Sequence, residues 1–173
     1  MVKSLYSKEV FEHFKHPRNL GKIKNPDAVG EAGNLLCGDV MRIYLKIKNN
    51  RIVDVKGEVL GCLVAIANTS MLTTMVKGKT LKEALKIRKE DLIKKLGGPE
   101  KVPPFKLHCS ILALDALHEA IYNYLKQRKL PIPKELKERH LAIQKTLKII
   151  EQRHKEFIEF EKNLFDESTQ KIH

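Results

Sequence analysis

The feature that most constrains the fold of this 173-residue chain is a pair of alternating runs joined by two asparagines. In residues 41–48 apolar side chains occupy every second position, with Arg, Tyr and Lys between them. A similar alternation returns in residues 52–59, after Asn49-Asn50. A period of two is typical of a strand that buries one face, and Asn tolerates the positive φ of a tight turn. We therefore expect an antiparallel hairpin with its apolar face covered by helices.

Three further segments have the pattern of the helices that would cover this hairpin. They are residues 8–15, which follow Ser7 and stop before His16-Pro17, residues 63–77, and a stretch from Ile111 to about residue 128. The second of these is apolar nearly all round, which indicates a buried helix. Pro103-Pro104 is expected to hold the chain extended before the third. The predicted fold class is α+β, a small antiparallel sheet covered by helices.

A linker, Leu130-Pro131-Ile132-Pro133, separates this domain from a charged tail. Beyond the linker, apolar residues recur every seven positions, at Leu136, Ile143, Ile150, Phe157 and Leu164. The alternate seam positions, His140, Leu147, His154 and Glu161, are mostly polar, so only half of a coiled-coil seam is apolar. We expect a domain at 1–130 and a long helical extension at 131–173. Docking on its own domain and pairing with another chain both stay open for this helix.

The charge distribution and the cysteine content limit the classes of function. The net charge is +12, and Lys and Arg are densest between residues 77 and 95. We interpret this run as a solvated surface rather than a nucleic-acid site, because no aromatic residue interrupts it to stack on bases. No apolar stretch is long enough to span a membrane, and the first residues lack a signal-peptide pattern. An odd number of cysteines argues against disulfides, so a reducing, cytoplasmic location is expected.

All three cysteines stand where predicted elements begin or end. Cys37 precedes the first strand of the hairpin and is two residues from Asp39. Cys62 follows the second strand. Cys109 lies beside His108 at the start of the helix that runs to about residue 128. Such junctions gather loops, and function is concentrated there. A thiol at a helix N-terminus is expected to have a lowered pKa, which favours the thiolate that binds metal. Ser110 is a candidate cap for that helix.

These residue types together predict a metal or sulfur site. Thiolate and imidazole ligands suit zinc or iron, whereas Asp is a poorer ligand for a soft metal and suggests a bound centre meant to leave. Taken singly, each cysteine is more often a small core hydrophobe. A thiol enzyme with Cys109 as nucleophile is disfavoured, because a base seldom orients onto its own neighbour's thiol. His13 and His118 occupy ordinary helix positions, where structural roles are expected, and His140 and His154 are placed among helix-surface charges.

At these residues the sequence resembles the iron–sulfur cluster scaffolds of the IscU type and the N-terminal domain of NifU. Four segments carry the resemblance over residues 5–128: Tyr6-Ser7 with His16-Pro17-Arg18-Asn19; Cys37-Gly38-Asp39-Val40-Met41; Gly61-Cys62 with Ala65-Ile66-Ala67; and Lys106-Leu107-His108-Cys109-Ser110-Ile111-Leu112. They occur in the family's order and at similar separations. The resemblance implies a small antiparallel sheet covered by helices and a scaffold rather than an enzyme.

The resemblance also implies a function and a role for each residue. A cysteine desulfurase would supply persulfide sulfur, with Cys109 as acceptor, and a [2Fe–2S] cluster would form with iron and pass to apo-proteins. Cys37, Asp39, Cys62 and His108 would complete the site, Asp39 being associated with cluster lability, and zinc would occupy it without a cluster. Lys106 would offset thiolate charge, and Tyr6 matches a residue implicated in homodimer formation. No membrane or nucleic-acid partner is implied.

Two segments depart from the family pattern. Val102-Pro103-Pro104-Phe105-Lys106 stands where many bacterial relatives have the Leu-Pro-Pro-Val-Lys that an Hsp70-type chaperone recognises, so the outer residues differ. Leu63-Val64 replaces the usual Gly-Ser after Cys62 and makes the site more apolar. A zinc-binding structural or regulatory protein that uses the same residues is the alternative function.

Overall fold

The protein is built around a three-stranded antiparallel sheet. The computed structural model describes residues 5–35 and 37–170, without the side chains of residues 105 and 161–170. The strands are β1 (Ala28–Gly33), β2 (Val40–Lys48) and β3 (Arg51–Leu60), in the order β1-β2-β3. Asn49 and Asn50 turn β2 into β3 with φ of 51° and 59°, which confirms the predicted hairpin. Met41 and Ile43 are fully buried on its apolar face.

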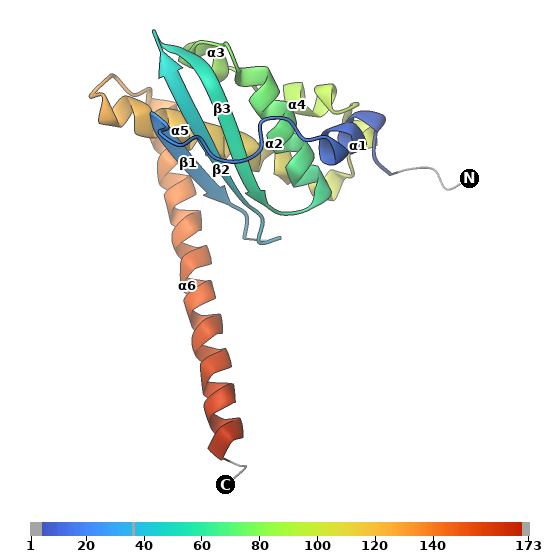
Figure 1. Ribbon diagram of the computed structural model, residues 1–173, viewed down its shortest axis with the longest axis vertical. Helices are drawn as coiled ribbons and strands as arrows, with labels where there is room; N and C mark the ends of the chain where they lie inside the picture. The colour runs from blue at the N-terminus through green and yellow to red at the C-terminus, as the bar shows by residue number, and fades with distance from the viewer. Residues whose placement is uncertain (1–4, 36, 171–173) are drawn as a thin grey trace.

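Two long helices, α2 (Leu63–Val76) and α5 (His108–Gln127), pack against the sheet. The α+β fold class is therefore confirmed (Figure 1). β1 crosses α5 so closely that a Cβ on Gly30 would come within 2.0 Å of the backbone nitrogen of Ala120. Only glycine fits there. α1 (Lys8–Lys15) packs on α2, and the short helices α3 (Leu81–Ala84) and α4 (Lys89–Lys95) follow α2 in the chain.

The exposed edge of β3 is partly covered by two other segments. Leu20 forms a parallel bridge to Gly57 on this strand. Near its start, Arg51 bridges to Thr80, and Ile52 donates a backbone hydrogen bond to Lys79. Unpaired strand edges invite pairing with other chains, so these contacts leave less of the edge exposed.

The segment before α5 differs in part from the prediction. Val102 and Pro103 are extended, with ψ of 117° and 138°, but short 3₁₀ turns, η1 (Pro99–Lys101) and η2 (Pro104–Lys106), stand on either side of them. A proline ring fixes φ near −65°, a value that suits both an extended chain and the first turn of a 3₁₀ helix. The proline pair alone therefore does not distinguish the two conformations.

The first half of α6 (Lys134–Gln170) docks on its own domain. Leu136 and Ile143 are each 5% exposed and belong to the main core. His140 is not on the charged surface as predicted: its Nδ1 lies 2.8 Å from the Glu119 carboxylate, and its ring stacks on Tyr122 at 3.7 Å between centroids. The second half of α6 projects away from the domain (Figure 1).

Candidate metal centre

The ends of several elements meet at one end of the sheet. Cys37 lies in the loop between β1 and β2, and Asp39 immediately precedes β2. Cys62 is the N-cap residue of α2, just after β3 ends. His108 and Cys109 are the first two residues of α5. Residues separated by more than 70 positions are thus brought together by the antiparallel sheet and the two helices that cover it.

The donor atoms of these five residues form two overlapping groups. In the first, the ligand atoms of Cys37, Asp39 and His108 all lie within 4.8 Å of one another, and in the second those of Asp39, Cys62 and Cys109 do. Cys37 Sγ is 3.3 Å from His108 Nε2, and Cys62 Sγ is 3.9 Å from Cys109 Sγ. Asp39 Oδ2, 4.0 Å from Cys109 Sγ, belongs to both groups. All five predicted donor residues therefore converge.

Two glycines allow the backbone to reach this arrangement. Gly38, between Cys37 and Asp39, has φ of 72°, a value that side-chain-bearing residues rarely adopt. A Cβ on Gly61 would lie 2.8 Å from the carboxyl carbon of Asp39, so a larger residue would push this carboxylate away. Cys62 caps α2 with an extended backbone, yet its side chain makes no capping hydrogen bond. Its thiol is therefore not used in capping α2.

Exposure differs across the group. Cys109 is fully buried and Asp39 is 6% exposed, whereas Cys37 is exposed and Cys62 and His108 are half-buried. The centre is thus open to solvent at Cys37, and its innermost donor is the buried Cys109. A bound metal would be accessible to a partner protein through the loop that carries Cys37.

The prediction of a lowered pKa for Cys109 is wrong. Burial raises the pKa of this thiol well above its ordinary value, the charges of Cys62 and Asp39 raise it further, and only Lys106 opposes them. The helix N-terminus favours a thiolate, but removing the thiolate from water costs more. In the metal-free protein Cys109 is therefore a thiol.

Ser110 is not the cap that the sequence predicted. Helix α5 begins earlier, at His108, and its N-cap residue is Leu107. Ser110 is 1% exposed, and its Oγ donates a hydrogen bond of 2.7 Å to Asn68 Oδ1 on α2. This buried bond joins the start of α5, one residue after Cys109, to α2. The single Asn in the apolar run of residues 63–77 is the signal that could have revealed it, since buried polar groups need partners.

Lys106 stands beside the thiols at the end of η2. The pKa of its ammonium is raised: burial alone would lower it, but the electrostatic interaction and hydrogen bond with Cys62, together with the interactions with Cys109 and Asp39, outweigh burial. A cation at this position offsets the charge of thiolates.

Tyr6 is not among the donor residues of the centre, and the segment 102–106 that matches the chaperone motif is described only in part. The Tyr6 ring packs edge-on against Phe11, with centroids 6.0 Å apart. Val102 is 1% exposed, Pro104 is exposed, and the side chain of residue 105 lies outside the description. These facts do not test the predicted self-association or chaperone recognition.

The fold and the centre define a class of protein, and a family model names it. Residues 5–130 match the model described as NifU-like N-terminal domain. The chain belongs to this family. Helix α6 lies outside the matched residues.

Curated relatives agree with the match. The "Iron-sulfur cluster assembly scaffold protein IscU 1" of Archaeoglobus fulgidus is 52% identical over 123 residues, which cover 71% of this chain and 78% of the relative. The IscU scaffold protein of Aquifex aeolicus is 44% identical and covers 69% and 76%. A relative from Drosophila melanogaster, named an iron-sulfur cluster assembly enzyme IscU, is 43% identical and covers 73% and 82%. The resemblance to IscU-type scaffolds is thereby confirmed.

Solved structures share the fold. FiSufU from Fervidobacterium islandicum AW-1, a candidate assembly scaffold of the SUF system, is 30% identical, with a TM-score of 0.57 over 68% of this chain and 96% of that one. A NifU-like N-terminal protein from Brucella abortus, 23% identical, has a TM-score of 0.61 over 71% and 96% and supports the fold alone. None of the helices in the described part of the chain is long and apolar enough to cross a membrane.

Proposed function

We propose that this chain is a scaffold on which a [2Fe–2S] cluster is assembled and from which it passes to apo-proteins. The observation that carries the proposal is the convergence of two three-donor groups that share Asp39 and open to solvent at Cys37. Three thiols with an imidazole suit iron, and the relatives named as assembly scaffolds support the same cargo. The scaffold would turn over no substrate of its own.

The cluster would be held by the three thiolates of Cys37, Cys62 and Cys109 and by a fourth ligand. Two irons that share bridging sulfides need four ligands from the protein. His108 and Asp39 both lie within reach of this fourth position. Exchange of a soft imidazole for a harder carboxylate weakens the cluster's attachment, so Asp39 would keep the site open to release.

Sulfur would arrive on Cys109. The Cys109 thiolate attacks the outer sulfur of a desulfurase persulfide, a new S–S bond forms to Cys109 Sγ, and the desulfurase cysteine leaves as a thiolate. The proton of the Cys109 thiol must first be lost, and the Lys106 ammonium favours that loss. Because Cys109 is buried, delivery requires the centre to open locally around this thiol.

Partners follow from this chemistry. A cysteine desulfurase would dock at the solvent-open side of the centre, and apo-proteins would receive the cluster there. Recognition of residues 102–106 by an Hsp70-type chaperone would require local opening, because Val102 is buried.

A zinc-binding structural or regulatory protein is the second candidate. Each donor group is compact enough to hold a single ion, and zinc accepts Cys, His and Asp in a tetrahedral set. Such a protein would bind zinc without building a cluster, so cluster assembly separates the two functions.

Anaerobic reconstitution tests the proposal. The purified protein is mixed with ferrous iron, cysteine, a cysteine desulfurase and dithiothreitol, which supplies the electrons that reduce persulfide sulfur to sulfide, and visible absorption is followed before and after addition of an apo-ferredoxin. We expect a [2Fe–2S] chromophore that moves to the ferredoxin, and its loss in Cys37→Ala, Cys62→Ala and Cys109→Ala. His16→Ala is a control that should leave the chromophore intact, because His16 is exposed and lies outside both donor groups. A chromophore that survives in all three cysteine variants, or a protein that retains zinc and never develops one, contradicts the proposal.

A further inference from the structure

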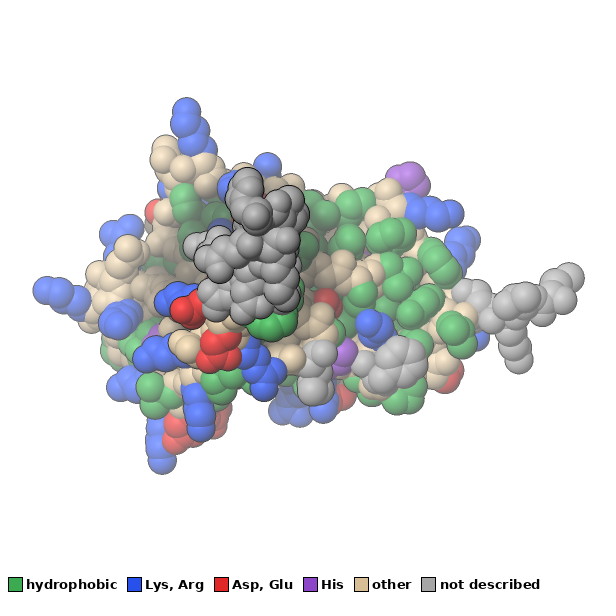
Figure 2. Space-filling model, turned by 90° about the horizontal axis from the view of Figure 1, so that it is seen from below, with side chains coloured by type: hydrophobic (Ala, Val, Ile, Leu, Met, Phe, Trp, Pro, Cys, Tyr) green, Lys and Arg blue, Asp and Glu red, His purple; other side chains and the backbone are tan. Residues whose placement is uncertain are grey.

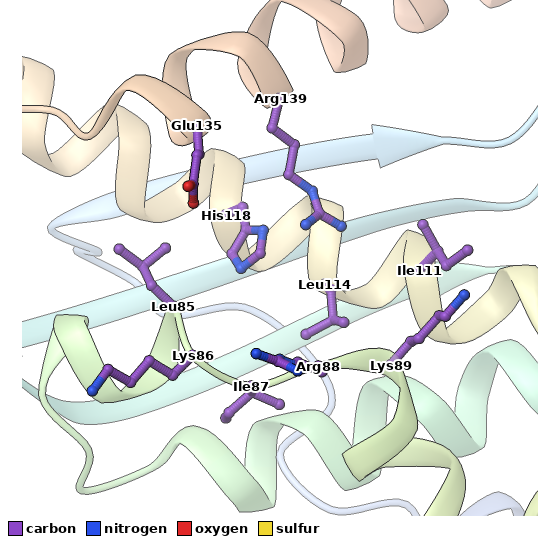
Figure 3. Close-up of a pocket in the computed structure, with 10 residues that line it drawn as sticks. All are labelled: Leu85, Lys86, Ile87, Arg88, Lys89, Ile111, Leu114, His118, Glu135 and Arg139. Atoms are coloured by element: carbon purple, nitrogen blue, oxygen red, sulfur yellow. The ribbon is translucent and has the colours of Figure 1, made fainter.

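A pocket of about 660 Å³ lies between three segments that do not contribute to the metal centre. Residues 85–89, the connection from α3 and the first residue of α4, form one wall, residues 111–118 of α5 form a second, and the first turns of α6 form the third (Figure 3). A volume between about 300 and 1,000 Å³ is typical of sites for small molecules. The pocket shares no residue with the two donor groups described above.

His118 is the buried polar side chain of this pocket. It is 6% exposed, and both of its ring nitrogens are buried without a hydrogen-bond partner among the described residues. The ring lies at the pocket, between Arg139 of α6 and Leu85 of the opposite wall (Figure 3). Burial, and secondarily the charge of Arg139, lowers the pKa of His118 to about 4. At neutral pH the ring is thus uncharged, with one N–H donor and one acceptor nitrogen, and buried polar groups are rarely left without partners.

Positive charge surrounds the opening. Lys86, Arg88 and Lys89 are exposed on the wall formed by residues 85–89, and Arg139 faces them from α6, against a single carboxylate, Glu135, in the lining. The Nε of Arg139 donates a hydrogen bond of 2.5 Å to Asp115. Its two terminal nitrogens donate none within the described part of the chain, so their four N–H groups remain for a ligand.

The floor of the pocket is apolar. Ile87 is 8% exposed and Leu114 is 3% exposed, and both line the cavity below the basic residues. An apolar floor with a few convergent polar groups is the usual composition of a small-molecule site. An inorganic ion would leave this floor uncovered.

We propose that the pocket binds a small organic phosphate. Its phosphate would lie among Lys86, Arg88 and Arg139, its apolar part would cover Ile87 and Leu114, and His118 would exchange a hydrogen bond with it. Phosphate is favoured over carboxylate because two guanidinium groups and two ammonium groups belong to residues that line the pocket, which suits an oxyanion with three or more acceptor oxygens.

The site depends on the helix that lies beyond the family match. Glu135 and Arg139 belong to α6, whereas the matched residues end at 130. The pocket is therefore completed by the extension of this chain, and its ligand would bind independently of the proposed cluster chemistry.

Calorimetric titration of the full chain tests the proposal with phenyl phosphate, inorganic phosphate and benzoate as probes. We expect saturable binding of phenyl phosphate, at least about tenfold tighter than that of either other probe. Arg88→Ala and His118→Phe are each expected to weaken it by about tenfold or more. Lys95→Ala is the matched control: it removes one positive charge from α4 but does not line the pocket, and it should leave the affinity within about twofold.

Two further measurements keep the result interpretable. Circular dichroism establishes that each variant is folded, and Lys86→Ala, an exposed position, repeats the test where folding is not at risk. Side-chain ¹⁵N spectra should show the His118 ring nitrogens shifting on addition of phenyl phosphate. Absence of saturable binding, equal binding of benzoate or inorganic phosphate, or an affinity unchanged in Arg88→Ala and Lys86→Ala would overturn the proposal.

Discussion

At the residue scale, the centre combines soft donors with one hard donor whose position is closely controlled. The thiols of Cys37, Cys62 and Cys109 come from three separate segments, and the carboxylate of Asp39 sits within reach of all of them. Asp39 keeps this place because Gly61 leaves room for it. Under the proposed function, the thiols would hold a bound centre and the Asp39 carboxylate would favour its release.

The role of Asp39 gives the first prediction. Asp39→Ala removes the hard ligand that competes at the fourth position, so the reconstituted cluster should persist longer, by about threefold or more, when challenged with a chelator. Decay of visible absorption measures this lifetime. Asp54→Ala is the matched control, since Asp54 lies near the start of β3, away from the centre, and pairs with Lys77. A shorter lifetime in Asp39→Ala, or an equal change in the control, would remove Asp39 from its assigned role.

Sequence patterns revealed which residues carry the chemistry but not their ionisation. The adjacency of His108 and Cys109, and of Cys37 and Asp39, is visible in the sequence, and each pair indeed meets the others. The raised pKa of Cys109 was not foreseen, because it depends on how deeply the start of α5 is buried. That depth is set by tertiary packing, which local sequence does not record.

At the scale of elements, α6 lies outside the residues that match the family model, yet its first half belongs to the hydrophobic core. Its first half contributes Leu136 and Ile143 to the core, and a Cβ on Gly33 of β1 would come within 2.5 Å of Ile150. Its second half carries apolar side chains that are exposed, such as Phe157 at 57%.

This division of α6 gives a stability prediction. Ile143→Ala should lower the free energy of unfolding by about 2–4 kcal/mol, because it removes a buried side chain and leaves a cavity. Phe157→Ala should change it by no more than about 0.5 kcal/mol, since the side chain is mostly exposed. Urea unfolding of the two variants measures the difference. Equal effects would mean that α6 is not docked as described.

The elements differ in how far sequence could predict them. The hairpin was predictable because alternation and an Asn-Asn turn agree with each other. The docking of α6 was not predictable. Polar residues such as His140 and Glu161 interrupt the seven-residue apolar repeat, so the pattern is typical of neither a coiled coil nor a core helix. In the structure, His140 is accommodated against the domain because it pairs with Glu119 of α5. This contact depends on the tertiary fold and is not visible in the local sequence.

At the scale of the whole molecule, the centre lies at one end of the sheet, the end toward which the second half of α6 extends (Figure 1). Seen from that side, hydrophobic side chains gather over one half of the surface, while most of the Lys and Arg side chains lie over the other (Figure 2). An apolar surface on this side of the molecule suits the docking of partner proteins that the proposed function requires.

Buried histidines give the whole molecule a predicted dependence on pH. The pKa of His118 is about 4 in the folded chain and about 6.5 in the unfolded chain. Between pH 6.5 and pH 4, His118 is therefore protonated in the unfolded chain and neutral in the folded chain. Stability should therefore fall as pH drops from about 6.5 to 4, by at most about 3 kcal/mol from this residue. Burial lowers the pKa of His13 as well, and this adds to the same trend.

Thermal unfolding of metal-free protein across this pH range measures the effect. His118→Phe should flatten the dependence and should not lower stability at pH 5, because it replaces two unsatisfied nitrogens with an apolar ring. His16→Phe, an exposed position, should leave the slope unchanged. An unaltered slope in His118→Phe would show that the His118 ring is not held neutral by burial.

The central claim, that iron is held between the three thiols at the end of the sheet, can be tested by anomalous diffraction. Crystals of the anaerobically reconstituted protein would be measured on both sides of the iron absorption edge. We expect iron density between Cys37 Sγ, Cys62 Sγ and Cys109 Sγ, with His108 or Asp39 as the remaining ligand. Iron density elsewhere on the chain, or a single ion at this place with the zinc edge and no iron signal, would contradict the claim.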